Sequence, residues 1–156
     1  MQQTGFLGTA APWTADLTLV LELALGIGLL AGALFARAGH YRLHAACQSF
    51  IVLFNLVLII LTMFPSFHSQ VLSKLPGKIG RPYYALAAAH AALGGLAELG
   101  GLYILLAAGT SFLPEKFRIT RYKFWMRTVL VIWWIVLCLG MATYARWYLP
   151  LRWETA

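Results

Sequence analysis

Four long apolar runs constrain the fold of this chain more than any other feature of its sequence. They extend from about Asp16 to Ala36, from about Leu43 to Phe64, from roughly Pro82 to Ala108 and from roughly Phe124 to Tyr148. Each is close to the ~20 residues that an α-helix needs to cross a bilayer. Prolines fall at or between the expected helix ends, where they are best tolerated. The pattern predicts an all-α fold: an integral membrane four-helix bundle with an antiparallel, up-down arrangement.

Composition agrees with a membrane location. The chain has 156 residues, of which 61% are hydrophobic and 11% charged, whereas roughly a quarter of the residues in a soluble domain are charged. We therefore expect residues 1–156 to form a single membrane domain. The net charge of +7 comes from basic residues that lie between the apolar runs rather than in one patch. Membrane lipid is thus the expected contact of these residues, and nucleic acid is not an expected partner.

The basic residues also give a weak orientation signal. Seven of them follow the first and third runs and five lie on the opposite side. The excess predicts that the first group is cytoplasmic, with both termini outside a bacterial inner (cytoplasmic) membrane. Met1 to Trp13 has no Lys or Arg ahead of the first apolar run, so we expect no cleaved signal peptide and a retained first helix.

Ionisable residues inside the third run point to a functional interior. His90 and Glu98 are eight residues apart and share one helix face, with Gly94 between them. Such groups are expensive at membrane depth and usually face a bundle interior. By helical rise, His90 and Glu22 of the first run lie about 12 and 9 Å from the same side. They are expected to sit at similar depth and to pair. The pair would form either a functional site, which binds a ligand or handles protons, or a structural hydrogen bond between helices.

The second run carries another polar stripe. His40, His44 and Gln48 follow at i, i+4 and i+8, a face expected to point into the bundle. His40 is expected in the loop, and Cys47 is either a buried apolar residue or a soft ligand for copper. Glu98 is expected to act as a proton-relay carboxylate or to partner Gln48 or a basic residue.

The first apolar run contains a helix-packing motif. Gly28 and Gly32 form a GxxxG pattern in the first run, which favours close helix packing.

His68 follows Pro65 in the one expected loop, from Ser66 to Arg81. Together with His90 it is the candidate metal pair, and His44 is a further candidate cofactor ligand. Imidazole ligates haem iron or copper, so either cofactor suits these residues. A bis-histidine haem would require the second helix to continue past Pro65. No nucleophile elbow, phosphate loop, HExxH or paired-carboxylate pattern is present in the sequence, so an enzyme is not expected.

Several short motifs lie at the ends of the apolar runs and inside them. The start of the second helix carries Gly39-His40-Tyr-Arg-Leu-His44, and its exit carries Phe67-His68. The third helix begins with Gly80-Arg81-Pro82-Tyr83-Tyr84 and contains His90. The fourth follows the basic run from Arg118 to Arg127 and carries Trp133 or Trp134 and Gly140-Met-Ala-Thr-Tyr144. Together these motifs resemble the CtaM/YozB-like family of small four-helix membrane proteins. Where that family often has a histidine in the loop before the fourth helix, this chain has Lys116-Phe117-Arg118.

The resemblance covers about Asp16 to Tyr148 and implies an accessory protein of the respiratory chain. Such a protein would help to mature haem-copper terminal oxidases and would contact other membrane subunits. It would handle haem or copper, or hold an assembly intermediate. Two other readings stay open: a b-type cytochrome electron-transfer subunit, and a cofactor-free structural subunit of a larger bioenergetic complex.

Overall fold

The computed structural model describes residues 5–114, 116, 118 and 120–149, and within these ranges the chain is helical without strands. The elements in order are α1 (Trp13–Arg37), α2 (Tyr41–Leu58), η1 (Ile59–Met63), α3 (Phe64–Gln70), η2 (Leu72–Lys74), α4 (Leu75–Lys78), α5 (Pro82–Gly109) and α6 (Tyr122–Tyr148). Four helical spans are long and apolar enough to cross a membrane: α1, the continuous segment Tyr41–Lys74, α5 and α6. The expectation of an all-α protein with four such helices is confirmed.

The second span is longer than its sequence predicts. Helix α2 leads into η1, a wide π-type turn, and α3 then carries the helix through Pro65 to Gln70. Proline lacks an N–H and its ring collides with the carbonyl one turn earlier. The wide turn avoids this conflict, because the Phe64 N–H bonds to the carbonyl of Ile59, five residues back. The predicted helix end at Phe64 and the predicted loop over 66–81 are therefore wrong, since α3, η2 and α4 occupy most of that segment.

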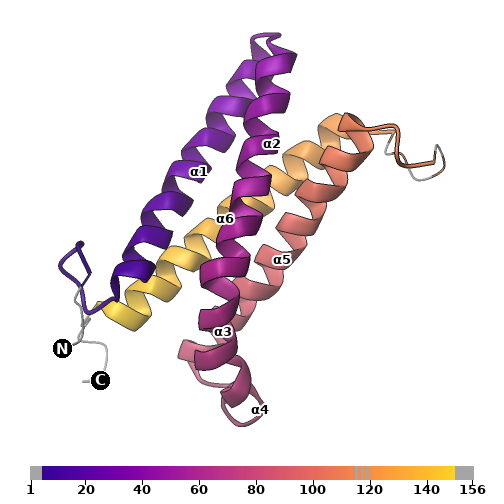
Figure 1. Cartoon of the computed structure of the whole chain (residues 1–156). Coiled ribbons are helices and arrows are strands. Elements are labelled where there is room, and N and C mark those ends of the chain that lie inside the picture. The colour runs from indigo at the N-terminus through magenta and orange to yellow at the C-terminus, as the bar shows by residue number, and fades with distance from the viewer. Residues whose placement is uncertain (1–4, 115, 117, 119, 150–156) are drawn as a thin grey trace.

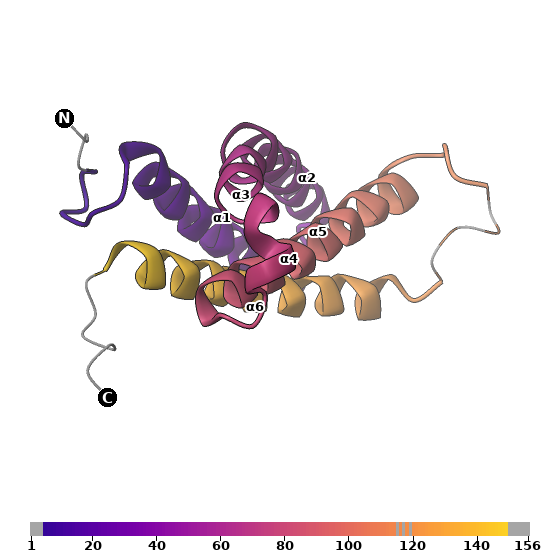
Figure 2. The same ribbon diagram turned by 90° about the horizontal axis from the view of Figure 1, so that it is seen from below.

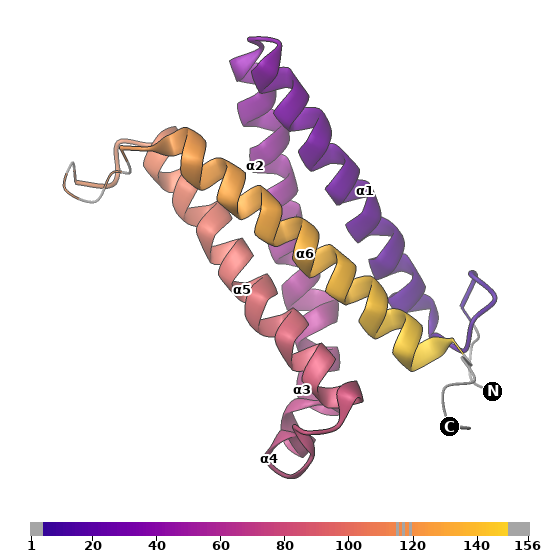
Figure 3. The ribbon, with the colours of Figure 1, turned by 180° about the vertical axis from the view of Figure 1, so that it is seen from behind.

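The spans pack in a ring of neighbours. Helix α1 contacts α2, α2 contacts α5, α5 contacts α6, and α6 closes against α1. Figure 1 shows α1 and α2 joined by a tight turn, while α5 and α6 cross behind them. Figure 2, seen from below, shows α3 and α4 lying across the end of the bundle. The start of α1 and the end of α6 lie close together in both Figure 1 and Figure 3.

Glycines set the closest approach between α1 and α2. A Cβ added at Gly28 would stand 2.9 Å from Cδ1 of Ile51, and one at Gly32 would stand 2.3 Å from Nε2 of Gln48. The GxxxG pattern therefore faces α2, where missing side chains let the two backbones come together. The turn between the helices relies on Gly39, whose φ of +81° favours glycine.

The apolar core draws on all four spans. Its buried members come from α1, α2, α5 and α6: Leu25, Leu29, Ile51, Val52, Leu58, Ala97 and Trp133. Most of each span lies outside this core, with only 17–22% of its most apolar window buried in the chain. Large apolar side chains such as Ile27, Leu61 and Leu99 are more than half exposed. The chain thus has a narrow interior and a broad apolar exterior.

Candidate functional site

His90 is held between α5 and α6 by one hydrogen bond and one close packing contact. Its Nδ1 lies 3.0 Å from the backbone carbonyl of Val136. A carbonyl only accepts, so Nδ1 carries the proton and, in a neutral ring, Nε2 keeps its lone pair. Nε2 makes no hydrogen bond with the described residues and is not fully buried. This is the state in which a metal-ligating histidine is usually held by its second shell.

Gly140 has no side chain, and the His90 ring occupies the space beside it. A Cβ added there would stand 2.9 Å from Cε1 and 3.3 Å from Nδ1 of His90. The ring therefore occupies space that any side chain at this position would take. Gly140 is the first residue of the sequence motif that ends at Tyr144, but no sequence feature placed Gly140 beside His90.

His44 has the same kind of tether on the other side of the molecule. Its Nδ1 lies 2.8 Å from the carbonyl of Gly32 on α1. One turn further along α2, Gln48 donates from Nε2 to the carbonyl of Leu29 at 3.1 Å. The Cys47 thiol lies 3.5 Å from the carbonyl of Gly28. The polar stripe on α2 thus faces the glycine-bearing surface of α1 and bonds to its backbone.

His68 and His40 lie at the surface. His68 is exposed on α3, and its ring centroid is 6.1 Å from that of Phe64. His40 is exposed at the start of α2. No hydrogen bond or ring contact joins His68 to His90 in the part of the chain that the structure describes. Nor do the described residues contain three His, Cys, Asp or Glu side chains grouped to hold a metal ion.

Three spans carry a polar side chain within their apolar length, and we call these residues the polar core: Glu22 of α1, Asn55 of α2 and Glu98 of α5. Asn55 donates from Nδ2 to Oε2 of Glu98 at 2.9 Å. Asn55 and Glu98 are 7% and 4% exposed. Three of the oxygens in this core have no hydrogen-bond partner among the described residues: Oε1 of Glu22, Oδ1 of Asn55 and Oε1 of Glu98.

The partners of these carboxyls differ from those expected. The hydrogen bond of His90 goes to Val136 rather than to Glu22, and that of Glu98 goes to Asn55 rather than to Gln48. Oε1 of Glu22 is buried and has no hydrogen-bond partner among the described residues. The third run therefore sends His90 toward α6 and Glu98 toward α2.

A second buried carboxylate forms what we call the terminal clamp: Asp16, Tyr144, Thr9 and the backbone of Leu7. Asp16 is 0% exposed. It accepts from the Tyr144 hydroxyl at 2.5 Å and from the Leu7 N–H at 2.7 Å. The Tyr144 oxygen also lies 2.7 Å from the hydroxyl of Thr9. The clamp joins the segment before α1 to the end of α6, a contact that no residue spacing predicted.

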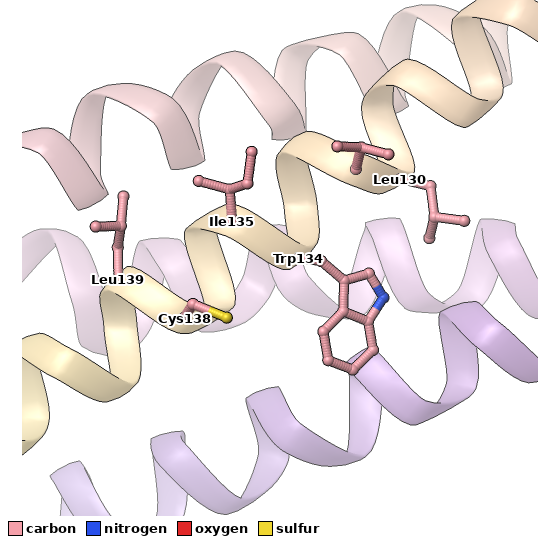
Figure 4. A pocket seen from close by; sticks show the side chains of 6 residues that line it. Leu130, Trp134, Ile135, Cys138 and Leu139 are labelled. Atoms are coloured by element: carbon pink, nitrogen blue, oxygen red, sulfur yellow. The ribbon is translucent and has the colours of Figure 1, made fainter.

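A shallow hollow lies along α6 (Figure 4). Its volume is about 540 Å³, and α6 alone lines it with Leu130, Val131, Trp134, Ile135, Cys138 and Leu139. Trp134 projects from α6 (Figure 4), and its ring would lie 3.7 Å from a Cβ added at Gly26 of α1. The lining contains no histidine or carboxylate, so the hollow suits apolar groups.

Comparison of the chain with protein-family models, with curated proteins and with solved structures gives no match.

Proposed function

We propose that the four spans insert into the bacterial inner membrane as an antiparallel, up-down bundle with both termini outside. Two observations support insertion. The exterior of the spans carries large exposed apolar side chains, and the hollow on α6 is apolar as well. In water, an exterior of this kind would form apolar patches far larger than soluble monomers show. The orientation rests on the seven-to-five excess of basic residues after the first and third runs.

We propose that within this membrane the chain is an accessory protein of the respiratory chain that serves haem-copper oxidase maturation. His90 is the imidazole that it offers to haem or copper, and other membrane subunits are its partners. The motif resemblance supports the role. One structural observation supports the site: Nδ1 of His90 donates its proton to the Val136 carbonyl, which leaves the Nε2 lone pair available to ligate a metal.

The donor set fits haem better than it fits a copper site built by this chain alone. Haem iron takes one or two axial ligands from protein, and His90 supplies one imidazole. Helix α3 continues past Pro65 and carries His68, but this side chain is exposed and makes no hydrogen bond or ring contact with His90 among the described residues. A protein copper site commonly uses three or more side chains, and the described residues hold no group of three such donors. When bound, haem would supply redox chemistry, and this chain would orient and hold it through His90.

The test is an air-oxidised and a dithionite-reduced absorption spectrum of the protein in mild detergent after addition of haem, with metal analysis of the same sample. We expect a haem spectrum with the wild-type chain, its loss in His90→Ala, and its retention in His40→Ala. The second variant is a fair control because His40 is exposed and has no tether like that of His90. Haem content of the terminal oxidase in the same membranes gives a second readout.

Other results would point elsewhere. Stoichiometric haem that survives purification from cells would favour a b-type cytochrome. Wild-type spectra and oxidase levels in both variants would contradict the histidine site and leave a structural subunit.

A further inference from the structure

Five aromatic rings form an unbroken series of contacts at the end of the bundle where α5 begins and α6 ends. The Tyr84 and Tyr83 rings have centroids 4.8 Å apart, and Tyr83 stacks on Trp147 at 4.8 Å with 12° between the planes. The Trp147 ring lies 6.2 Å from Tyr148, which lies 5.2 Å from Tyr144. We call these residues the aromatic series. All four distances are in the range of direct ring contact, so an electron can pass from each ring to the next in a short step.

Tyr144 differs from the other members of the series in what its hydroxyl contacts. It donates to Oδ1 of Asp16 at 2.5 Å, a length typical of a charge-assisted bond to a carboxylate. Asp16 is 0% exposed, and its Oδ2 accepts from the Leu7 N–H. Because the Tyr144 proton is directed at Asp16, the Thr9 hydroxyl is the donor in its 2.7 Å bond with the Tyr144 oxygen. Tyr144 therefore has a proton acceptor already in place.

The other rings of the series have no such acceptor. The Tyr148 hydroxyl bonds to the side chain of Gln70, which is a neutral amide and not a base. Nε1 of Trp147 is buried without a hydrogen-bond partner among the described residues. Nζ of Lys78 lies 5.7 Å from the centroid of the Tyr84 ring, and a nearby cation opposes the removal of an electron. A phenol that loses an electron becomes a strong acid, so oxidation is easiest where a carboxylate can take the proton.

We propose that Tyr144 is a redox-active tyrosine, which gives one electron to a strong one-electron oxidant while its hydroxyl proton passes to Oδ1 of Asp16. The O–H bond of Tyr144 breaks and an O–H bond forms on Asp16. The oxidant is reduced by one electron, and Tyr144 becomes a neutral phenoxyl radical. Return of one electron and of the same proton restores both side chains. An aromatic belt accounts for rings at a membrane surface, but it does not require a buried carboxylate bonded to one of them.

The position of Tyr144 also suits an oxidant formed at His90. The His90 ring occupies the space beside Gly140, which is one helical turn from Tyr144 on α6. Haem bound to His90 and exposed to peroxide would produce an oxidant of the required class at that level of the bundle. This source alone rests on the function proposed above. The reaction between Tyr144 and Asp16 needs no haem.

Photo-oxidation of the haem-free protein in lipid nanodiscs tests the proposal. A flash-excited ruthenium tris-bipyridine complex with persulfate supplies the oxidant, and electron paramagnetic resonance detects tyrosyl radicals. We expect a long-lived tyrosyl signal in the wild type that forms more slowly in deuterium oxide, because a proton moves with the electron. Tyr144→Phe and Asp16→Asn should each lose this signal. Tyr41→Phe should keep it, because Tyr41 is 69% exposed and lies outside the aromatic series.

A measurement on the wild-type chain covers the case in which a variant fails to fold. A nitroso spin trap binds covalently to tyrosyl radicals, and mass spectrometry should locate its adduct on Tyr144. The absence of a long-lived signal, or an adduct found only on exposed tyrosines such as Tyr41, would overturn the proposal. A wild-type signal in a folded Asp16→Asn chain would equally overturn it, because the proton would then not depend on Asp16. Since no haem is added, failure of the haem site in its own test leaves this result unaffected.

Discussion

At the scale of single residues, a glycine decides how a histidine is presented. The His90 ring can reach the Val136 carbonyl because Gly140 leaves the space beside it empty. That bond fixes which ring nitrogen keeps its lone pair. A position without a side chain thus determines the chemistry of a residue on the neighbouring helix.

Gly140→Ala tests this dependence. The new Cβ would stand 2.9 Å from Cε1 of His90, so the ring must move and its bond to Val136 must weaken. We expect a loss of about 1–3 kcal/mol in unfolding free energy, typical of overpacking, and weaker haem binding by titration. Gly95→Ala is the matched control on α5, because nothing lies within 4 Å of a Cβ there. Equal stability and haem affinity in the two variants would contradict the idea that Gly140 makes room for the His90 ring.

At the scale of elements, the second span shows how a helix passes a proline. The π-type turn η1 moves the hydrogen bonds by one residue just before Pro65, and the Thr62 hydroxyl donates to the Leu58 carbonyl at 2.8 Å. The register of the helix hydrogen bonds thus changes by one residue immediately before the proline. His68 consequently lies on a helix rather than in a loop.

The variant Pro65→Ala distinguishes a helix that continues to Lys74 from a helix that ends at Phe64. If the helix already runs to Lys74, as in the structure, removing the proline adds no helix. We therefore expect the far-ultraviolet circular dichroism of the variant in detergent to match that of the wild type. A clear gain in helical signal would mean that the native helix stops at Phe64, as the sequence rule predicts.

Hydrophobicity was enough to predict the four spans but not the passage through Pro65. Runs of apolar residues identify membrane-length helices because the bilayer sets one length for all of them. The rule that prolines end helices ignores the π-type turn, which depends on how residues 59–63 bond locally.

The candidate site was harder to predict, because residue number gives depth along a helix but not the rotation of each helix against its neighbours. Depth placed Glu22 beside His90, whereas rotation directs the His90 ring to the Val136 carbonyl of α6. Four packed spans fix those rotations together.

At the scale of the whole molecule, the terminal clamp joins the two ends of the chain. Asp16 lies in the first turn of α1 and Tyr144 near the end of α6. The buried carboxylate of Asp16 depends on the Tyr144 hydroxyl and the Leu7 N–H for its hydrogen bonds. The first and last spans are therefore held together by polar contacts as well as by apolar packing.

Tyr144→Phe should weaken this connection. The change removes the 2.5 Å bond to Asp16 and leaves a buried carboxylate oxygen without that donor. We expect a loss of about 1–3 kcal/mol in unfolding free energy, measured by thermal or denaturant unfolding in detergent. Tyr41→Phe is the control, because Tyr41 is 69% exposed and should change stability little. A Tyr144→Phe chain as stable as the control would show that the clamp contributes nothing.

The position of the clamp also imposes an order on biosynthesis. Asp16 and Tyr144 are 128 residues apart, so Asp16 emerges from the ribosome long before its hydroxyl partner exists. On the proposed membrane topology, the first two spans can insert as a hairpin while Asp16 still lacks its hydroxyl partner on the last span. Closing the clamp is therefore a late event in synthesis. Chains truncated before Tyr144 would keep this carboxylate without its hydroxyl partner.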